Sequence, residues 1–434
     1  MLKACIYTLG CRVNQYESDA IMQELQRDGI SIVNTDTECH ICIINTCSVT
    51  GESDRKSKQI IRRLSKKNPN AVIVVTGCFA ELNPQIASKI PGVDLVCGNN
   101  AKSQIARLVK ELAYKKSAEC QLHMPSIYDG RFDVMSAGAP LNRTRAFIKI
   151  QDGCDSKCAY CIIPFARGSV RSNTRENILR EARQIVAEGC REIVFTGIET
   201  ASYGKDLKNG YSLGDLLTEA SQIEGLERIR LGSLDPSQIT REFVDKISML
   251  HKIMPHFHIS MQSGCSQTLR EMKRKYNIEM AKERLDYLRA KIPNVKFSAD
   301  VITGFPGESD ENFQETLEFF KEQKFLHLHI FPYSKREGTL AATMDNQVPE
   351  QIKKERLHML EKQQAEIKAE LLRELCEKSP YSEVLFETYD GEYILGHTPE
   401  FVEVKVKSCY PHGNELLRVK ITHSDGDYIY GELV

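Results

Sequence analysis

The chain has 434 residues, of which 41% are apolar and 27% charged, and its formal net charge is −1. This length and composition predict a globular protein of two to four domains, and the near-zero charge does not by itself indicate a polyanion partner. No apolar run approaches the roughly 18 residues of a membrane span, and no signal peptide opens the chain, so its fifteen cysteines favour metal ligands or core positions in a cytoplasmic protein.

Strand and helix alternate along the first 115 residues. Strands are predicted at residues 3–9, 41–45, 71–76 and 93–97, and helices at 16–28, 54–67, 84–90 and 101–115. This alternation is typical of an α/β unit with a parallel, Rossmann-like sheet.

Three cysteines of this first unit occupy equivalent positions. Cys11, Cys47 and Cys78 each follow a predicted strand and precede a helix, in the motifs Thr-Leu-Gly-Cys, Asn-Thr-Cys and Thr-Gly-Cys. The carboxyl ends of parallel strands share one edge of the sheet, so the three thiols are expected to be neighbours. Three converging thiolates suggest an iron–sulfur cluster with one open iron, and three buried structural cysteines are the alternative.

Two further cysteines have C-x-x-C spacing. Cys42 belongs to the predicted strand 41–45, and an odd offset along a strand points side chains to opposite faces. We therefore predict that Cys39 and Cys42 do not share a metal. The unclustered cysteines are interpreted as core or surface residues: Cys5, Cys97, Cys120, Cys190, Cys265, Cys376 and Cys409.

A second strand–helix alternation begins after residues 117–143, which lack periodicity and are predicted to form a linker. Strands are predicted at 145–151, 192–197, 228–233, 256–261, 296–302 and 327–333, and helices at 175–188, 240–250, 266–291 and 310–323. Six such units make a partial (β/α)6 barrel, whose active site is expected at the carboxyl ends of the strands. A charged helix at 351–376 is expected to close the barrel edge.

The loop after the first barrel strand carries Cys154, Cys158 and Cys161, with gaps of three and two residues. Three thiolates again leave one corner of an iron–sulfur cube open. A structural zinc site would require a fourth ligand close by, and the following residues 162–166 offer none. Zinc therefore remains the minor alternative.

The last segment has a different pattern. Short alternating strands are predicted at 383–388, 393–397, 401–407, 416–421 and 427–433, separated by turn residues, and indicate a small antiparallel β-barrel. Residues 377–434 hold five Lys or Arg against eleven Asp or Glu, so an RNA surface is expected mainly on the rest of the chain. The predicted domains are 1–115, 140–375 and 376–434.

The Cys154–Cys161 motif, with an aromatic residue before its last cysteine, resembles that of radical S-adenosylmethionine (SAM) enzymes. The order of the three units, together with the motif Asp300–Glu308, resembles the methylthiotransferases, a radical SAM branch with a terminal TRAM barrel. This resemblance implies two [4Fe–4S] clusters, on Cys11, Cys47 and Cys78 and on Cys154, Cys158 and Cys161. SAM would be both the methyl donor and the source of a 5′-deoxyadenosyl radical.

The subgroup is indicated by two local motifs. Cys11-Arg12-Val13-Asn14 and the segment 331–339 resemble the enzymes that transfer a methylthio group to C2 of N6-threonylcarbamoyladenosine at adenosine 37 of tRNA. The alternatives are the same chemistry on isopentenyladenosine tRNA or on a ribosomal-protein aspartate, and a non-catalytic iron–sulfur RNA-binding protein. The implied partners are tRNA and an electron donor such as flavodoxin or ferredoxin. The resemblance further implies a monomer, and the lack of a long apolar run predicts no membrane partner.

Other candidate residues follow from the resemblance and from charge. The implied SAM contacts are Tyr160, Gly197, Glu199, Ser233, Gln262, Asp300 and Phe331, although barrel-mouth polarity alone would also explain polar residues there. Candidate RNA contacts are basic residues at Arg55, Lys56, Lys58, Arg62, Arg63, Lys66 and Lys67, and the segment Lys273-Arg274-Lys275-Tyr276. The pairs His256/His258 and His327/His329 are interpreted as barrel interior or surface, not as metal ligands.

Overall fold

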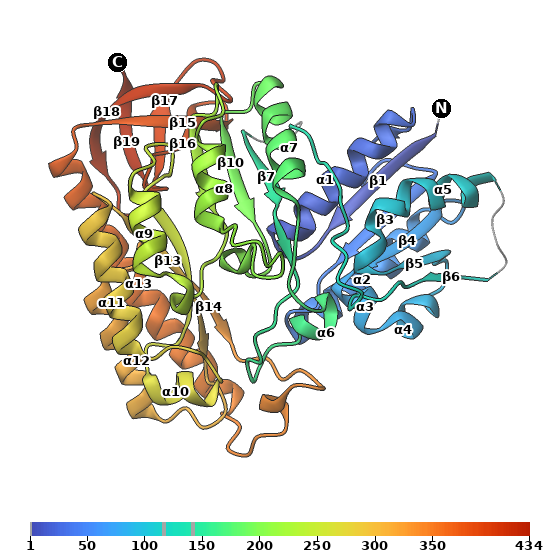
Figure 1. Cartoon of the computed structure of the whole chain (residues 1–434), viewed down its shortest axis with the longest axis horizontal. Coiled ribbons are helices and arrows are strands. Elements are labelled where there is room, and N and C mark those ends of the chain that lie inside the picture. The colour runs from blue at the N-terminus through green and yellow to red at the C-terminus, as the bar shows by residue number, and fades with distance from the viewer. Residues whose placement is uncertain (1, 115–118, 140–143) are drawn as a thin grey trace.

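The computed structural model describes residues 2–114, 119–139 and 144–434 (Figure 1). Its first unit is a sheet of six parallel strands in the order β2-β1-β3-β4-β5-β6. The strands are β1 (Lys3–Thr8), β2 (Ser31–Ile32), β3 (Ile41–Thr46), β4 (Val72–Gly77), β5 (Leu95–Cys97) and β6 (Gln121–His123). The Rossmann-like prediction is confirmed. However, β6 lies in the predicted linker, where three residues pair with β5 despite their lack of apolar periodicity.

Helices cover both faces of this sheet. They are α1 (Arg12–Arg27), α2 (Gly51–Lys67), α3 (Cys78–Leu82), α4 (Pro84–Ser88), the 3-10 helix η1 (Asn99–Gln104) and α5 (Ile105–Tyr114). Strand β3 shows why both faces are covered, because all six of its residues are buried. Ile43 packs in one apolar cluster with Ile21 of α1, whereas Ile44 packs in another with Ile61 of α2. Side chains that alternate between two apolar layers are typical of a parallel sheet.

The second unit is a partial barrel of six parallel strands. They are β7 (Arg145–Lys149), β10 (Glu192–Thr196), β11 (Arg228–Leu231), β12 (His256–Gln262), β13 (Lys296–Thr303) and β14 (His327–Pro332). Two three-stranded sheets, β11-β10-β7 and β12-β13-β14, are joined by the bridges Ile229–Ile253 and Leu234–Ile259. The (β/α)6 prediction is confirmed. The first predicted strand is split, because β8 (Gln151–Asp152) turns away to pair with β9 (Arg171–Ser172).

The helices around this barrel are α6 (Ile163–Arg167), α7 (Arg175–Ala187), α8 (Leu213–Ala220), α9 (Arg241–Ser248), α10 (Ser266–Glu271), α11 (Ile278–Lys291), α12 (Asp310–Gln323) and α13 (Glu350–Lys378). The predicted helix at 266–291 is therefore two helices. Lys273 adopts a left-handed conformation (φ 58°) that interrupts the first, and the Asn277 side chain caps the second by accepting from the Met280 N–H. Helix α13 packs along β14, the last barrel strand. None of the described helices combines the length and apolar composition of a membrane span.

The last unit is a closed five-stranded barrel in the order β15-β16-β17-β19-β18. Its strands are β15 (Tyr381–Tyr389), β16 (Tyr393–His397), β17 (Glu403–Lys407), β18 (Leu416–Ser424) and β19 (Ile429–Leu433). The small barrel is confirmed, and its strand pairs are antiparallel except for β17 and β19, which pair in parallel. The chain runs from β17 to the far neighbour β18 before β19 fills the gap between them.

This small barrel covers the amino ends of the large barrel's strands (Figure 1). Arg230 donates hydrogen bonds of 3.0 Å to two backbone carbonyls in the turn that precedes Phe401. The Phe401 ring lies against the guanidinium groups of Arg145 and Arg230, 4.8 and 4.7 Å from its centroid, and stacks on His256. Phe401 therefore forms the floor of the large barrel, opposite the strand ends where the cysteine loop lies.

Candidate functional site

The first cysteine triad lies where the sequence predicts it, at the carboxyl ends of adjacent strands. Cys11 follows β1, Cys47 follows β3, and Cys78 is the first residue of α3 directly after β4. These three strands are neighbours in the sheet. Cys11 is exposed, whereas Cys47 and Cys78 are buried. Burial raises the pKa of Cys78 to about 11, against the opposing charges of Arg167 and Lys102.

Two glycines allow these strand ends to approach each other. Gly77 has φ +95°, and a Cβ atom there would lie 2.3 Å from the Thr46 carbonyl oxygen. Gly10 has φ +105°, and its Cβ would lie 3.1 Å from Cβ of Cys47. Only glycine meets both the backbone and the space requirement. The two glycine–cysteine motifs are thus explained by close packing around the triad.

The second triad lies in the loop between β8 and α6. Its cysteines, Cys154, Cys158 and Cys161, are all half-buried. The Cys154 thiol donates to the Glu199 carboxylate at 3.3 Å, and Cys158 Sγ accepts a hydrogen bond of 3.3 Å from Arg274. Burial raises the pKa of both Cys154 and Cys161 to about 12, so these thiols hold their protons until a metal displaces them.

The two triads face each other across the junction of the two units. Helix α3, which begins with Cys78, packs against α6, which follows Cys161, and the charge of Cys78 contributes to the raised pKa of Cys161. In the described ranges neither triad has its three sulfurs within 4.8 Å of one another. Thiolates on a single tetrahedral zinc lie about 3.8 Å apart. The donor set of three separated sulfurs therefore fits a multi-iron cluster better than a single ion.

A buried ion network joins the two units beside the triads. The carboxylate of Glu17, on α1, is fully buried and accepts from Lys149 at 3.0 Å, from Arg167 at 2.5 Å and from Lys102. Asp152, two residues before Cys154, lies 3.2 Å from both Lys149 and Arg167. Burial alone would raise the pKa of Glu17, but the three cations hold it well below its usual range. Sequence reasoning missed this network, although Glu17 and Asp152 lie close to the motif cysteines.

The predicted SAM contacts occupy the same end of the barrel. Gly197 and Glu199 follow β10, where the Glu199 N–H donates to the Gln151 side chain at 2.9 Å. A Cβ atom on Gly197 would lie 2.6 Å from the same Gln151 oxygen. The Tyr160 hydroxyl lies 3.4 Å from Arg274. Gln151 and Arg274 are site residues that the sequence interpretation missed.

The other four predicted contacts are spread over later strands. Ser233 is half-buried after β11, and Gln262 is buried at the end of β12 with a positive φ of 62°. Phe331 is 45% exposed on β14. Asp300 lies within β13, and its carboxylate is 3.0 Å from Nε2 of His258. Their contact with a cofactor stays a prediction.

The four barrel histidines contact one another and their neighbours. The His258 ring lies 5.3 Å from that of His329, which lies 4.5 Å from that of His327. The His258 Nδ1 is 2.8 Å from the Ser298 hydroxyl. Within the described ranges no histidine belongs to a group of three close metal-ligating atoms, and their assignment to the barrel interior or surface stays a prediction.

Arg12, the first residue of α1, reaches into the barrel. With Arg145, Arg230, His256 and other residues it lines a cavity of about 40 Å³ above the Phe401 floor. The surrounding protein and the charges of Arg145 and Arg230 lower the pKa of Arg12, whereas Asp300 opposes them. Arg12 is exposed, and among the described residues its guanidinium has no hydrogen-bond or ion-pair partner.

Part of the predicted RNA surface is wrong. Arg274 and Tyr276 are turned inward, because Arg274 contacts Cys158 and forms a 2.6 Å ion pair with Asp235, while the Tyr276 hydroxyl donates to the Met261 carbonyl at 2.7 Å. Lys273 and Lys275 of the same segment remain exposed. The basic residues of α2 also remain exposed, and they form the larger accessible RNA candidate: Arg55, Lys56, Arg62, Arg63, Lys66 and Lys67.

Cys39 and Cys42 lie close together, against the prediction, and Cys5, which was expected to be unclustered, joins them in the core. The sulfur atoms of Cys5, Cys39 and Cys42 all lie within 4.8 Å of one another. Cys42 is indeed in β3, but Cys39 precedes the strand, so the alternation of strand side chains does not apply to it. Cys5 is the direct register partner of Cys42 in β1 and completes the group.

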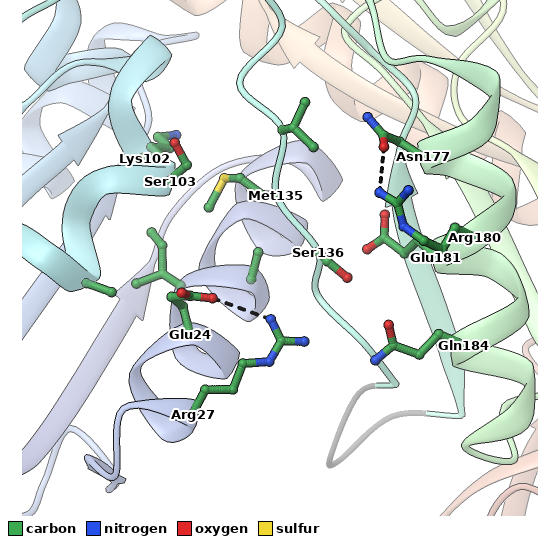
Figure 2. A pocket seen from close by; sticks show the side chains of 14 residues that line it. Glu24, Arg27, Lys102, Ser103, Met135, Ser136, Asn177, Arg180, Glu181 and Gln184 are labelled. Carbon is green, nitrogen blue, oxygen red and sulfur yellow. Dashed lines mark hydrogen bonds and ion pairs between the residues drawn. The ribbon is translucent and has the colours of Figure 1, made fainter.

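A separate cavity of about 300 Å³ lies between α1, the residues around Met135 and α7 (Figure 2). None of the six triad cysteines lines it. Glu181 of α7 is buried beside it, where its carboxylate accepts from the Tyr16 hydroxyl at 3.1 Å and from the Ala137 N–H at 2.8 Å. Burial raises the pKa of Glu181 to about 7.

The sequence of this chain matches two family models and a group of related enzymes. Residues 148–320 match the radical SAM superfamily, and residues 3–98 match the family described as Uncharacterized protein family UPF0004. The threonylcarbamoyladenosine tRNA methylthiotransferase MtaB of Bacillus subtilis is 39% identical over 100% of this chain and 97% of its own length. The tRNA-2-methylthio-N(6)-dimethylallyladenosine synthase of Alkaliphilus oremlandii is 33% identical, covering 100% of this chain and 93% of its own length.

Solved structures show the same fold at low sequence identity. The radical SAM methyltransferase TsrM from Kitasatospora setae aligns with a TM-score of 0.58 and 12% identity, over 78% of this chain and 74% of its own. The fold alone does not identify the family, but the full-length sequence matches to tRNA methylthiotransferases do. The chain belongs to the family of radical SAM tRNA methylthiotransferases.

Proposed function

We propose that this enzyme transfers a methylthio group to C2 of N6-threonylcarbamoyladenosine at adenosine 37 of tRNA. Cys154, Cys158 and Cys161 would hold one [4Fe–4S] cluster, and Cys11, Cys47 and Cys78 the other. Bound there, SAM and the clusters would supply a methyl group, sulfur and a 5′-deoxyadenosyl radical, which an unactivated aromatic C–H bond requires. The protein's own residues then have to bind, orient and shield the reacting groups.

The residues around the strand ends fit these tasks. The implied SAM contacts are Tyr160, Gly197, Glu199, Ser233, Gln262, Asp300 and Phe331. Arg274 donates to Cys158 Sγ and would hold this ligand in place while stabilising its negative charge. The ion network of Glu17 fixes α1, and with it Cys11, against the barrel. Phe401 closes the barrel floor, which limits the access of water from that side.

One observation carries the choice of substrate. The threonylcarbamoyl group ends in a carboxylate, whereas the dimethylallyl group named for other relatives is apolar. Arg12 lines the barrel cavity next to Cys11 and has no ion-pair partner among the described residues, whereas Arg145 and Arg230 are already committed to carboxylates of the protein. A charge-assisted bond from Arg12 to the threonyl carboxylate would select the anionic substrate.

The experiment compares two tRNA substrates, one carrying threonylcarbamoyladenosine and one carrying isopentenyladenosine. Methylthiolated nucleosides are measured by mass spectrometry, and 5′-deoxyadenosine formed without tRNA is measured in parallel. The wild-type enzyme should modify the first tRNA, and Arg12→Gln should lower that activity by roughly 10–100-fold, as loss of a hydrogen bond to a charged group of 1.5–3 kcal/mol predicts. SAM cleavage without tRNA should persist in this variant.

Two results would decide against the proposal. Preferred modification of the isopentenyladenosine tRNA would identify the other branch. If Arg12→Gln loses SAM cleavage together with tRNA modification, Arg12 acts on SAM and the substrate argument fails. Arg55→Gln, on the exposed face of α2, is the control for a general loss of tRNA attraction and should weaken both tRNAs alike.

The partners follow from the same proposal. The basic residues of α2 would attract the tRNA backbone, and a one-electron donor such as flavodoxin or ferredoxin would reduce the clusters. Because one chain carries both triads, a monomer suffices for the reaction. A tRNA substrate and fifteen cysteines that must stay reduced are compatible with the cytoplasm.

A further inference from the structure

The group formed by Cys5, Cys39 and Cys42 lies away from the proposed active site. Cys5 and Cys42 are directly opposite each other on β1 and β3, in the amino-terminal halves of these strands. Cys11 and Cys47 follow the carboxyl ends of the same strands. The two groups of thiols are therefore at opposite ends of one sheet, and the radical chemistry does not use the first.

The separations of the three sulfurs suit a single metal ion. Cys5 Sγ and Cys39 Sγ are 3.4 Å apart, and all three sulfurs lie within 4.8 Å of one another. Thiolates bound at about 2.3 Å to one tetrahedral zinc lie about 3.8 Å apart. In the part of the chain that the structure describes, this is the one set of three or more metal-ligating side chains gathered so closely.

A fourth donor faces the group. The side-chain oxygen of Asn68, which is the C-cap of α2, lies 3.6 Å from Cys39 Sγ and 3.4 Å from the Cys39 N–H. Asn68 is 2% exposed, and its amide nitrogen is occupied by a hydrogen bond to the Leu64 carbonyl. The oxygen is therefore held in one orientation, toward the thiols.

Charge favours a divalent ion over a monovalent one. The three thiols are buried at 0%, 6% and 0% exposure in an apolar cluster with Ile44, Ile61 and Leu64. Three thiolates with a divalent cation leave one negative charge, whereas a monovalent ion would leave two. Uncompensated charge in an apolar site is costly, so the divalent ion is preferred.

Apolar packing alone would not require three thiols around one point, because Val or Ala would fill the same core.

We propose that Cys5, Cys39, Cys42 and the Asn68 oxygen form a structural site for a thiophilic divalent cation, with zinc as the ion to be tested. Binding would join β1, β3 and the end of α2 at the edge of the sheet opposite the active site. Metal affinity would then appear as added stability of the first unit.

The test uses the full-length enzyme with its iron–sulfur clusters reconstituted anaerobically and then exposed to Zn²⁺. Native mass spectrometry separates bound zinc from iron and sulfide by mass. One zinc per chain is expected beyond the iron–sulfur load. Cys39→Ser should lose it, and Asn68→Leu should weaken it by roughly 10–100-fold. Cys39 is chosen because it precedes the strand, so its replacement disturbs the sheet least.

Two controls keep the result specific. Cys97→Val removes a buried cysteine from β5 of the same sheet and should keep the zinc. A chain with all six triad cysteines replaced by Ser should also keep the zinc. If the zinc were instead bound at an empty iron–sulfur site, this chain would lose it. Zinc occupancy that is unchanged in Cys39→Ser, or absent from the wild type, would overturn the proposal. If Cys39→Ser fails to fold, zinc X-ray absorption on the six-Ser chain decides between three sulfurs with one oxygen and any other ligand set.

Discussion

Removal of the charge on Glu17 is the perturbation that best tests how the two large units are held together. In Glu17→Gln the side chain keeps its size, but Lys102, Lys149 and Arg167 lose their shared carboxylate. Asp152 remains as a carboxylate partner for Lys149 and Arg167 only. Glu17 and its three cationic partners each have side chains that are at most 1% exposed, so water cannot replace the lost charge. Breaking a buried ion pair in this way costs about 3–5 kcal/mol.

The assay is hydrogen exchange measured by mass spectrometry on anaerobic protein, because a multidomain chain does not unfold in one step. A local loss of about 3 kcal/mol would speed exchange of the α1 amides by roughly 100-fold. Glu24→Gln is the matched control on the same helix. Glu24 is 52% exposed in its pair with Arg27, so its replacement should cost below about 1 kcal/mol.

A double variant sharpens the interpretation. Adding Lys102→Met to Glu17→Gln removes one uncompensated cation and should restore part of the lost protection. If Glu17→Gln exchanges at the rate of Glu24→Gln, the network does not hold α1 to the barrel and the reasoning is wrong.

Three more expectations follow from single sites. Burial raises the pKa of Glu181 to about 7, against an ordinary 4.5, so its contribution to stability is complete below about pH 4.5 and is lost as the pH rises through 7. The total loss is about 3 kcal/mol. Glu181→Gln should therefore flatten the dependence of the melting temperature on pH between 5 and 8, and an unchanged slope would contradict this assignment. Gly77→Ala should lower the iron content by about half, because the new Cβ would lie 2.3 Å from the Thr46 carbonyl oxygen and displace one triad. The control Gly29→Ala shares the positive φ but meets nothing within 4 Å, so it should keep full iron. Equal iron content in both variants would refute the packing argument. Arg274→Met should weaken retention of the cluster on Cys158 by roughly 10–100-fold and change its electron paramagnetic resonance spectrum, whereas the exposed neighbour Lys273→Met should change neither.

The sequence was a good guide wherever a regular pattern governed the position. Cys11, Cys47 and Cys78 were predicted to converge because each follows a strand of one parallel sheet, and the strands have that arrangement. The six βα units of the second half were predicted from the same alternation. The domain limits 1–115, 140–375 and 376–434 stay predictions, and residues 115 and 140 lie outside the described residues.

The errors have a common physical origin, which is that one-dimensional patterns do not specify what faces a charged or polar side chain. Arg274 looks like a surface charge in the sequence, but Asp235 and Cys158 come from distant segments to meet it. The partners of Glu17 are likewise distant in the sequence, at separations of 85, 132 and 150 residues. The alternation of side chains along a strand does not extend to Cys39, because Cys39 precedes β3.

The Phe401 floor has a consequence for how this enzyme can be taken apart. The small barrel supplies backbone acceptors for Arg228 and Arg230 and the ring beneath Arg145. A chain truncated before residue 379 would remove the acceptors that the small barrel supplies, leave Arg145 and Arg230 with Glu192 alone, and open the reaction chamber from below. Exchange of this segment between relatives would therefore succeed only if the arginines at the amino ends of the strands were exchanged with it.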